Sequence, residues 1–151
     1  MSLPHPILAI DHGEARIGLA ITDPVGIMAH PLETVSNDSS AIDRILQLIA
    51  QRQVQSLVIG LPLRMDGSEG TAGQKIRRFK NQLKTNLPEH FPIEMVDERM
   101  TTIAASEKLR EAGKKEKQQK GIIDQAAAVE ILNSYLQSQS NPFGLLEDPD
   151  A

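Results

Sequence analysis

The chain has 151 residues, 40% of them hydrophobic and 24% charged, which is the composition of one globular domain with a sizeable core. It has no cysteine, which excludes disulfides, thiolate zinc sites and cysteine nucleophiles. No apolar run approaches the roughly 20 residues that span a bilayer, and the N-terminal MSLPHP lacks the basic start and apolar middle of a signal peptide. We therefore expect a cytoplasmic protein with no membrane partner.

The net charge of −4 is unevenly distributed along the chain. Residues 61–120 carry 13 Lys and Arg against nine Asp and Glu, whereas residues 121–151 carry five acidic side chains and no basic one. A net-positive middle segment in an acidic protein permits an anionic partner such as nucleic acid. Runs of charge are more often solvated faces, so this pattern alone does not decide the partner.

The first part of the chain reads as three consecutive antiparallel strands. The segments ILAID (7–11) and RIGLAIT (16–22) predict a hairpin joined by the polar turn HGEA. The segment IMAHPLETV (27–35) predicts a third strand, in which Pro31 indicates an edge or irregular position.

The rest of the chain alternates helix with strand. Apolar residues at helical spacing predict helices, and short apolar runs ending at Gly, Pro or acidic residues predict buried strands. These elements are a helix around 42–50, a strand at 56–62, a helix around 72–83, a strand at 92–98, a helix at 101–113 and, after a charged hinge at 114–120, a last helix to about 136. The order βββαβαβα predicts an α/β fold in which helices flank a mixed five-stranded sheet. It forms a single domain over 1–139, followed by an acidic tail at 140–151.

Three carboxylates stand at the ends of predicted elements. Asp11 closes the first strand, Glu98 closes the last, and Asp124 opens the final helix on the stripe that faces the sheet. If the first and last strands lie near the sheet centre, these carboxylates converge at one edge and favour a site for Mg²⁺ or Mn²⁺. Each has a simpler alternative: Asp11 as an Asx-turn residue, Glu98 as a partner of Arg99, and Asp124 as a helix N-cap.

Other chemistries fit the sequence less well. It contains neither GxGxxG nor GxxxxGK[ST], and its four histidines lack zinc-ligand spacing. Paired carboxylates also occur in glycosidases, but a chain with no Trp, one Tyr and three Phe offers little surface on which sugars or unpaired bases could stack.

Four segments together resemble a known family. AIDHGEARIGLAITD, LVIGLPLRMDGSEG, VDERMTT and DQAAAVEILNSYL are similar, in order and spacing over nearly residues 7–137, to the RuvX (YqgF) family of the RNase H-like superfamily. The resemblance implies an RNase H-like fold and a nuclease that processes the 5′ end of the small-subunit (16S) ribosomal RNA precursor during ribosome biogenesis. It also implies kinship with Holliday junction resolvases.

The same resemblance places the family's acidic triad on Asp11, Glu98 and Asp124. In a two-metal nuclease, Asp11 would bridge the ions and the other two carboxylates would each hold one. Resolvases have a further acid one turn along the last helix, where this chain has Ala127. Phosphate contacts would come from Arg16, Arg64, Lys75, Arg78 and Arg99.

Three alternatives to an RNA-processing nuclease remain open. A Holliday junction resolvase-like DNA endonuclease would act on branched DNA, although Ala127 weakens that interpretation. A non-catalytic RNA-binding factor for ribosome assembly would use the fold without metal, although carboxylates at a binding edge repel phosphate. A nucleotide-dependent phosphotransferase is suggested by DHGEARIG alone, and the chain offers neither the second domain nor the second phosphate loop that such enzymes need.

Overall fold

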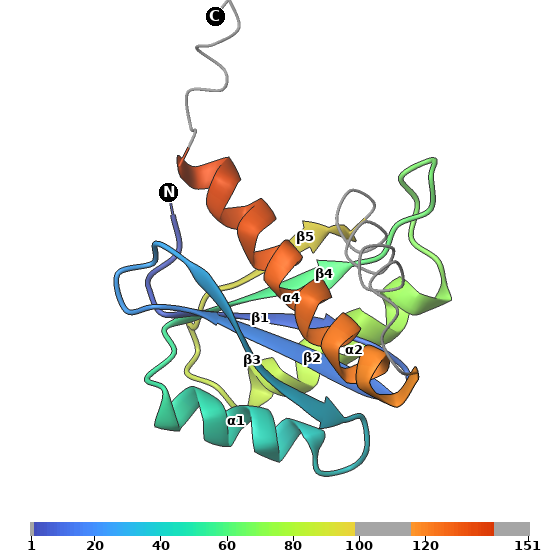
Figure 1. Cartoon of the computed structure of the whole chain (residues 1–151), viewed down its shortest axis with the longest axis horizontal. Helices are drawn as coiled ribbons and strands as arrows, with labels where there is room; N and C mark the ends of the chain where they lie inside the picture. The colour runs from blue at the N-terminus through green and yellow to red at the C-terminus, as the bar shows by residue number, and fades with distance from the viewer. Residues whose placement is uncertain (1, 99–115, 141–151) are drawn as a thin grey trace, which may run out of the picture.

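The structure is a computed structural model that describes residues 2–98 and 116–140, with side chains of the last helix described from 123 to 139. Within these residues the predicted strands and helices are all present, and apart from the last helix, which is longer at both ends, their ends differ from the prediction by one or two residues. The predicted helix at 101–113 and residues 141–151 of the expected tail lie outside the described residues. The elements, labelled as in Figure 1, are β1 (Ile7–His12), β2 (Arg16–Thr22), β3 (Ala29–Ser36), α1 (Ala41–Gln51), β4 (Ser56–Leu61), α2 (Thr71–Thr85), β5 (Ile93–Asp97) and α4 (Glu116–Ser140).

The strands form one mixed five-stranded sheet in the order β3-β2-β1-β4-β5, which confirms the predicted α/β class (Figure 1). The first three strands pair antiparallel, and β1–β4 and β4–β5 pair parallel. Pro31 lies in the edge strand β3, opposite Ala20 at a shift in register, as predicted. The condition considered for the acidic site, that the first and last strands both lie near the centre, is met by β1 and not by β5. Because β4 pairs with both β1 and β5, β1 is central and β5 is the other edge strand.

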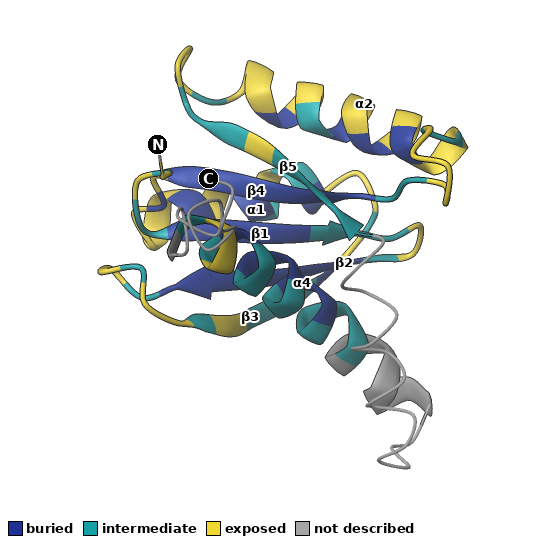
Figure 2. Cartoon of the chain, turned by 90° about the horizontal axis from the view of Figure 1, so that it is seen from above, coloured by how far each residue is buried: buried dark blue, intermediate teal, exposed yellow. Residues whose placement is uncertain are grey.

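The sheet separates two apolar layers, because successive side chains of a strand point to opposite faces. In β1, Leu8 and Ile10 pack into the layer beneath α1 and α2, whereas Ile7 and Ala9 pack into the layer beneath α4. Figure 2 shows the buried strands between the helices of the two faces. The alternation directs Asp11, the next residue in the series after Ile7 and Ala9, to the α4 side.

Helix α4 differs from its prediction at its N-terminal end. It begins at Glu116, so Asp124 lies inside the helix. The expectation that Asp124 opens the helix is wrong, and so is the alternative that it is an N-cap. The charged stretch that was expected to be a hinge is helical from residue 116, because Glu, Lys and Gln are good helix formers and no proline interrupts them. Although α4 is long, neither it nor any other helix in the described part of the chain is apolar enough over a sufficient length to cross a membrane.

Candidate active site

Asp11 is held at the end of the central strand, between two glycines of the neighbouring strands. It pairs directly with Gly18 of β2, and it lies one residue beyond the Ile10–Ile59 pair that sets Gly60 of β4 beside it. Glycine inside a strand often marks the close approach of another group. Here Gly18 allows helix α4 to approach the sheet, and Gly60 allows the side chain of Glu98 to approach it.

Gly18 allows α4 to pack directly on the sheet. A Cβ atom at this position would lie 1.9 Å from the carbonyl oxygen of Asp124, a separation that no side chain can tolerate. The backbone of α4 therefore rests on β2 at the level of Asp11. This contact, and not helix capping, places Asp124 at the sheet edge.

Gly60 makes room for the side chain of Glu98. A Cβ atom on Gly60 would lie 2.6 Å from Oε1 of Glu98, so the carboxylate lies over β4 in the space that a side chain at this position would fill. Glu98 follows the edge strand β5, two strands away from Asp11 in the sheet order. This crossing explains how an acid on an edge strand reaches the centre.

The pKa of Asp11 reflects these neighbours. Burial is the largest cause of its rise, and the hydrogen bond to Glu98 and the negative charges of Glu98 and Asp124 raise the pKa further, to about 9. A carboxyl group in such surroundings gives up its proton readily only when a cation offsets the charge. The structure thus brings the three predicted acids together on the α4 side of one sheet edge.

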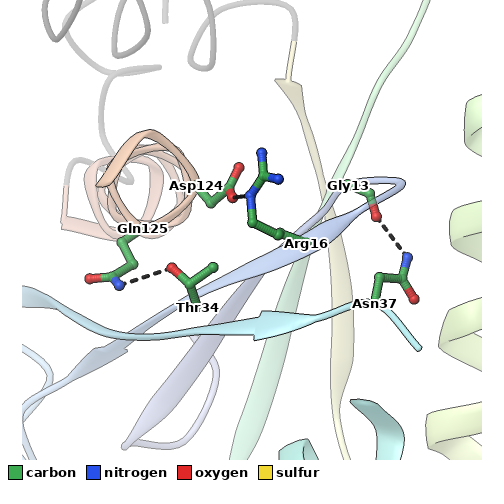
Figure 3. A network of polar contacts seen from close by, with 6 residues as sticks. All are labelled: Gly13, Arg16, Thr34, Asn37, Asp124 and Gln125. Carbon is green, nitrogen blue, oxygen red and sulfur yellow. Dashed lines mark hydrogen bonds and ion pairs between the residues drawn. The ribbon is translucent and has the colours of Figure 1, made fainter. Parts of the chain in front are cut away.

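Asp124 is turned toward an arginine of the neighbouring strand. Nε of Arg16 donates a hydrogen bond to Oδ2 of Asp124 over 2.9 Å (Figure 3). Burial raises the pKa of Asp124, and the hydrogen bond and charge of Arg16 oppose that rise. Within residues 2–98 and 116–140, no three His, Cys, Asp or Glu side chains are arranged as a ready-made metal site.

The chemistry of the donors nevertheless fits a hard divalent cation. All three are carboxylates, the type of ligand that Mg²⁺ and Mn²⁺ prefer, and Gly60 leaves space for one of them. Asp11, Glu98 and Asp124 are therefore the residues that could hold such an ion, once Asp124 is no longer engaged by Arg16.

Asn37, which is not among the predicted site residues, stabilises the turn between β1 and β2. Its Nδ2 donates to the carbonyl of Gly13 over 2.7 Å (Figure 3). The same nitrogen lies 3.2 Å from Nε2 of His12, and the backbone N–H of Asn37 donates to the carbonyl of Ala15 over 3.0 Å. These bonds position the turn that leads into Arg16. No signal in the sequence singles out this asparagine, because its partners come from a turn more than 20 residues earlier. Gly18 in β2 and Gly60 in β4 do carry a signal in the sequence, because a glycine inside a predicted strand often marks the close approach of another group.

The predicted phosphate-binding cations are placed unequally. Arg16 lies at the acidic edge, and Lys75 of α2 reaches the same edge, where its Nζ donates to Glu14 of the β1–β2 turn over 2.9 Å. Arg78 is exposed one turn further along α2, and Arg64 lies in the loop between β4 and α2. Arg99 lies outside the described residues.

The arrangement of the described elements defines an RNase H-like α/β protein with an acidic edge. Among solved structures, a chain described as "T. thermophilus RuvC in complex with Holliday junction substrate" superposes with a TM-score of 0.54. The superposition covers 88% of this chain and 94% of that one at 14% sequence identity, so it supports the fold alone.

Sequence relatives identify the family. The model of the family described as "RuvX: Holliday junction resolvase" matches residues 5–138, so the chain belongs to the RuvX family. A protein of Streptomyces coelicolor is 46% identical over 87% of this chain and 80% of its own length. One of Chloroflexus aggregans is 44% identical over 91% of this chain and 96% of its own length. Both carry the name "Putative pre-16S rRNA nuclease".

Proposed function

We propose that this protein is a divalent-metal-dependent nuclease that processes the 5′ end of the 16S ribosomal RNA precursor. The observation that carries the proposal is the convergence of Asp11, Glu98 and Asp124 from three different elements on one edge of the sheet. A cluster of buried carboxylates is unfavourable until a cation joins it. Stability alone gives no reason to build one, whereas phosphodiester hydrolysis does.

In this proposal the carboxylates of Asp11, Glu98 and Asp124 hold Mg²⁺ or Mn²⁺. When bound, such ions activate a water molecule and stabilise the leaving oxygen of an in-line displacement at phosphorus. The protein supplies the oxygen ligands, fixes them through the backbone of β1 and α4, and binds the phosphates on either side of the scissile bond. Those contacts come from Arg16 and Lys75 at the edge, and from Arg64, Arg78 and Arg99.

RNA is the substrate that we favour, because the relatives with more than 40% identity carry a name that specifies a ribosomal RNA precursor. Maturation of such a precursor would place the protein in the cytoplasm. Branched DNA is a second candidate, supported by the description of the family as a Holliday junction resolvase and by the fold shared with RuvC. Against it, Ala127 is fully buried against the sheet where resolvases have a further acid, so that position offers the site no carboxylate.

The test is a nuclease assay with Mg²⁺ or Mn²⁺ on three substrates: structured 16S precursor RNA, single-stranded RNA and a four-way DNA junction. We expect cleavage of the precursor RNA, none in EDTA, and none by Asp11→Asn. Asp43→Asn is the matched control, because Asp43 is an exposed carboxylate in the first turn of α1, outside the site. Preferred cleavage of the junction would replace RNA by branched DNA, and cleavage that persists in EDTA would rule out the metal mechanism.

A further inference from the structure

The ion pair between Arg16 and Asp124 occupies a carboxylate that the proposed metal site needs. The Asp124 side chain is 16% exposed and that of Arg16 is 36% exposed, so the pair lies at the rim of the site with the guanidinium on the solvent side. Figure 3 shows Nε of Arg16 bonded to the carboxylate of Asp124, with no dashed line from either Nη group to that carboxylate. Those two groups form a planar pair of donors of the kind that matches a phosphate.

The backbone on the Asp124 side is fixed. The carbonyl of Asp124 lies where a side chain on Gly18 would be, and Nε2 of the next residue, Gln125, donates to Oγ1 of Thr34 in β3 over 2.9 Å (Figure 3). Helix α4 is thus held to β2 and β3 at this level. Moving the Asp124 carboxylate between Arg16 and the site requires rotation of one side chain and no movement of the helix.

The backbone on the Arg16 side is fixed as well. The carbonyl of Arg16 accepts the N–H of Gly13 over 2.9 Å, and Asn37, which follows β3, holds the same turn. Arg16 therefore presents its guanidinium from a rigid base at the acidic edge. A nucleic-acid backbone that reaches Asp11 would also reach this guanidinium.

We propose that Arg16 is a positioning residue that keeps Asp124 from the cation until a phosphodiester takes the guanidinium, so that metal binding and nucleic-acid binding reinforce each other. The inference rests on the proposed function, since it assumes that the three carboxylates hold a metal. Its physical basis is competition between Arg16 and the cation for the carboxylate of Asp124. In the free protein a divalent ion must displace a charge-assisted hydrogen bond and tolerate a nearby positive charge, and a bound phosphate removes both costs. Linkage then requires that the metal raise nucleic-acid affinity by the same factor.

The experiment measures Mn²⁺ binding to the whole chain by titration calorimetry, with no nucleic acid present. We compare wild type, Arg16→Gln and, as matched control, Arg44→Gln, which breaks the ion pair between Arg44 and Glu33 on the other side of the sheet. Coupling factors of about 5- to 150-fold are typical between linked sites. We expect Arg16→Gln to bind Mn²⁺ about tenfold more tightly than wild type, and Arg44→Gln to bind it as wild type does. A residue needed only for structural integrity would change the affinity in the opposite direction.

A second arm repeats the titration with a 12-nucleotide phosphorothioate RNA, which slows cleavage. RNA should tighten Mn²⁺ binding more in wild type than in Arg16→Gln, and Arg16→Lys, which keeps the charge without the planar fork, should give an intermediate gain. Equal or weaker Mn²⁺ binding by Arg16→Gln alone would overturn the role of Arg16 and leave the metal site standing. Failure of every variant to bind Mn²⁺, with or without RNA, would remove the metal site and the proposed function together.

Discussion

Asp11 lies at the end of β1 and Asp23 directly follows β2 of the same hairpin, so they lie at opposite ends of the antiparallel pair, and their surroundings differ completely. Asp23 is exposed, and its carboxylate accepts the backbone N–H groups of Val25, Ile27 and Met28 over 3.0–3.1 Å. These hydrogen bonds lower the pKa of Asp23, and the one from Ile27 makes the largest contribution. Burial and the neighbouring carboxylates raise the pKa of Asp11.

The comparison separates two reasons for an aspartate after a strand. Asp23 organises its own turn, which is the simpler role considered for Asp11. The turn that follows Asp11 is closed instead by the backbone hydrogen bond from Gly13 to Arg16 and by Asn37, so its geometry does not depend on the Asp11 carboxylate. A turn aspartate is satisfied by donors of the chain itself, whereas Asp11 faces groups that share its charge.

The largest expected difference is in catalysis. Asp11→Asn keeps the shape of the side chain and removes its charge, so nuclease activity should fall by on the order of a hundredfold or more. Asp23→Asn should leave activity unchanged and lower the melting temperature, because an amide oxygen is a weaker acceptor for three backbone donors. The measurements are cleavage rates at saturating Mn²⁺ and thermal unfolding of both variants. Full activity in Asp11→Asn would mean that Asp11, like Asp23, serves only its own turn.

Gly18, which pairs with Asp11, should not tolerate an added methyl group. Gly18→Ala places a Cβ 1.9 Å from the carbonyl oxygen of Asp124, so α4 must shift and the free energy of unfolding should fall by about 1–3 kcal/mol or more. Gly70→Ala is the control: its nearest atom would be 3.4 Å away, on Arg64, and the expected change is about 0.5 kcal/mol or less. Denaturant unfolding compares the two. Equal stabilities would mean that α4 does not rest on β2 as described.

The two aspartates should also give opposite pH dependences of stability in EDTA. The raised pKa of Asp11 favours the folded state while the group is protonated, and this contribution is lost as pH rises from its ordinary value of 3.8 toward about 9. Asp11→Asn should therefore gain stability relative to wild type with increasing pH. The lowered pKa of Asp23 stabilises the folded state above its ordinary value of 3.8 and is lost as pH falls through that region, so Asp23→Asn should approach wild type in acid. Melting temperatures from pH 3 to pH 9 provide the check, and parallel curves for the two variants would contradict it.

The smallest effect is expected from the cations of α2. Neutralising Lys75 and Arg78 to Gln should weaken RNA binding severalfold across sequences and lower the slope of log affinity against log salt by about one per lost phosphate contact. Arg52 and Lys84, changed to Gln together, remove the same charge near the edge where Asp23 lies and should have less effect. Anisotropy titrations at several salt concentrations measure both pairs. Equal slopes for the two double variants would exclude Lys75 and Arg78 from the interface.

The local pattern of residues determined the secondary structure and the identity of the acids. The apolar runs of β1 and β2 and the helical stripes of α1 and α2 are short-range signals, and in each case the side chains that must be buried specify the element. The same patterns marked Asp11, Glu98 and Asp124 as carboxylates near element ends. For Asp124 the reason was wrong, because the charged stretch before it continues the helix.

Only the tertiary structure decided how those acids meet. The sheet order sets Glu98 directly after an edge strand, and the absence of a side chain at Gly60 lets the Glu98 side chain reach the centre. Gly18 brings α4 against β2, and Arg16 then meets Asp124 across 108 positions of sequence. Such contacts depend on which strands pair and how closely a helix can approach them. A sequence pattern expresses the preferences of each segment, but it contains no distance between segments.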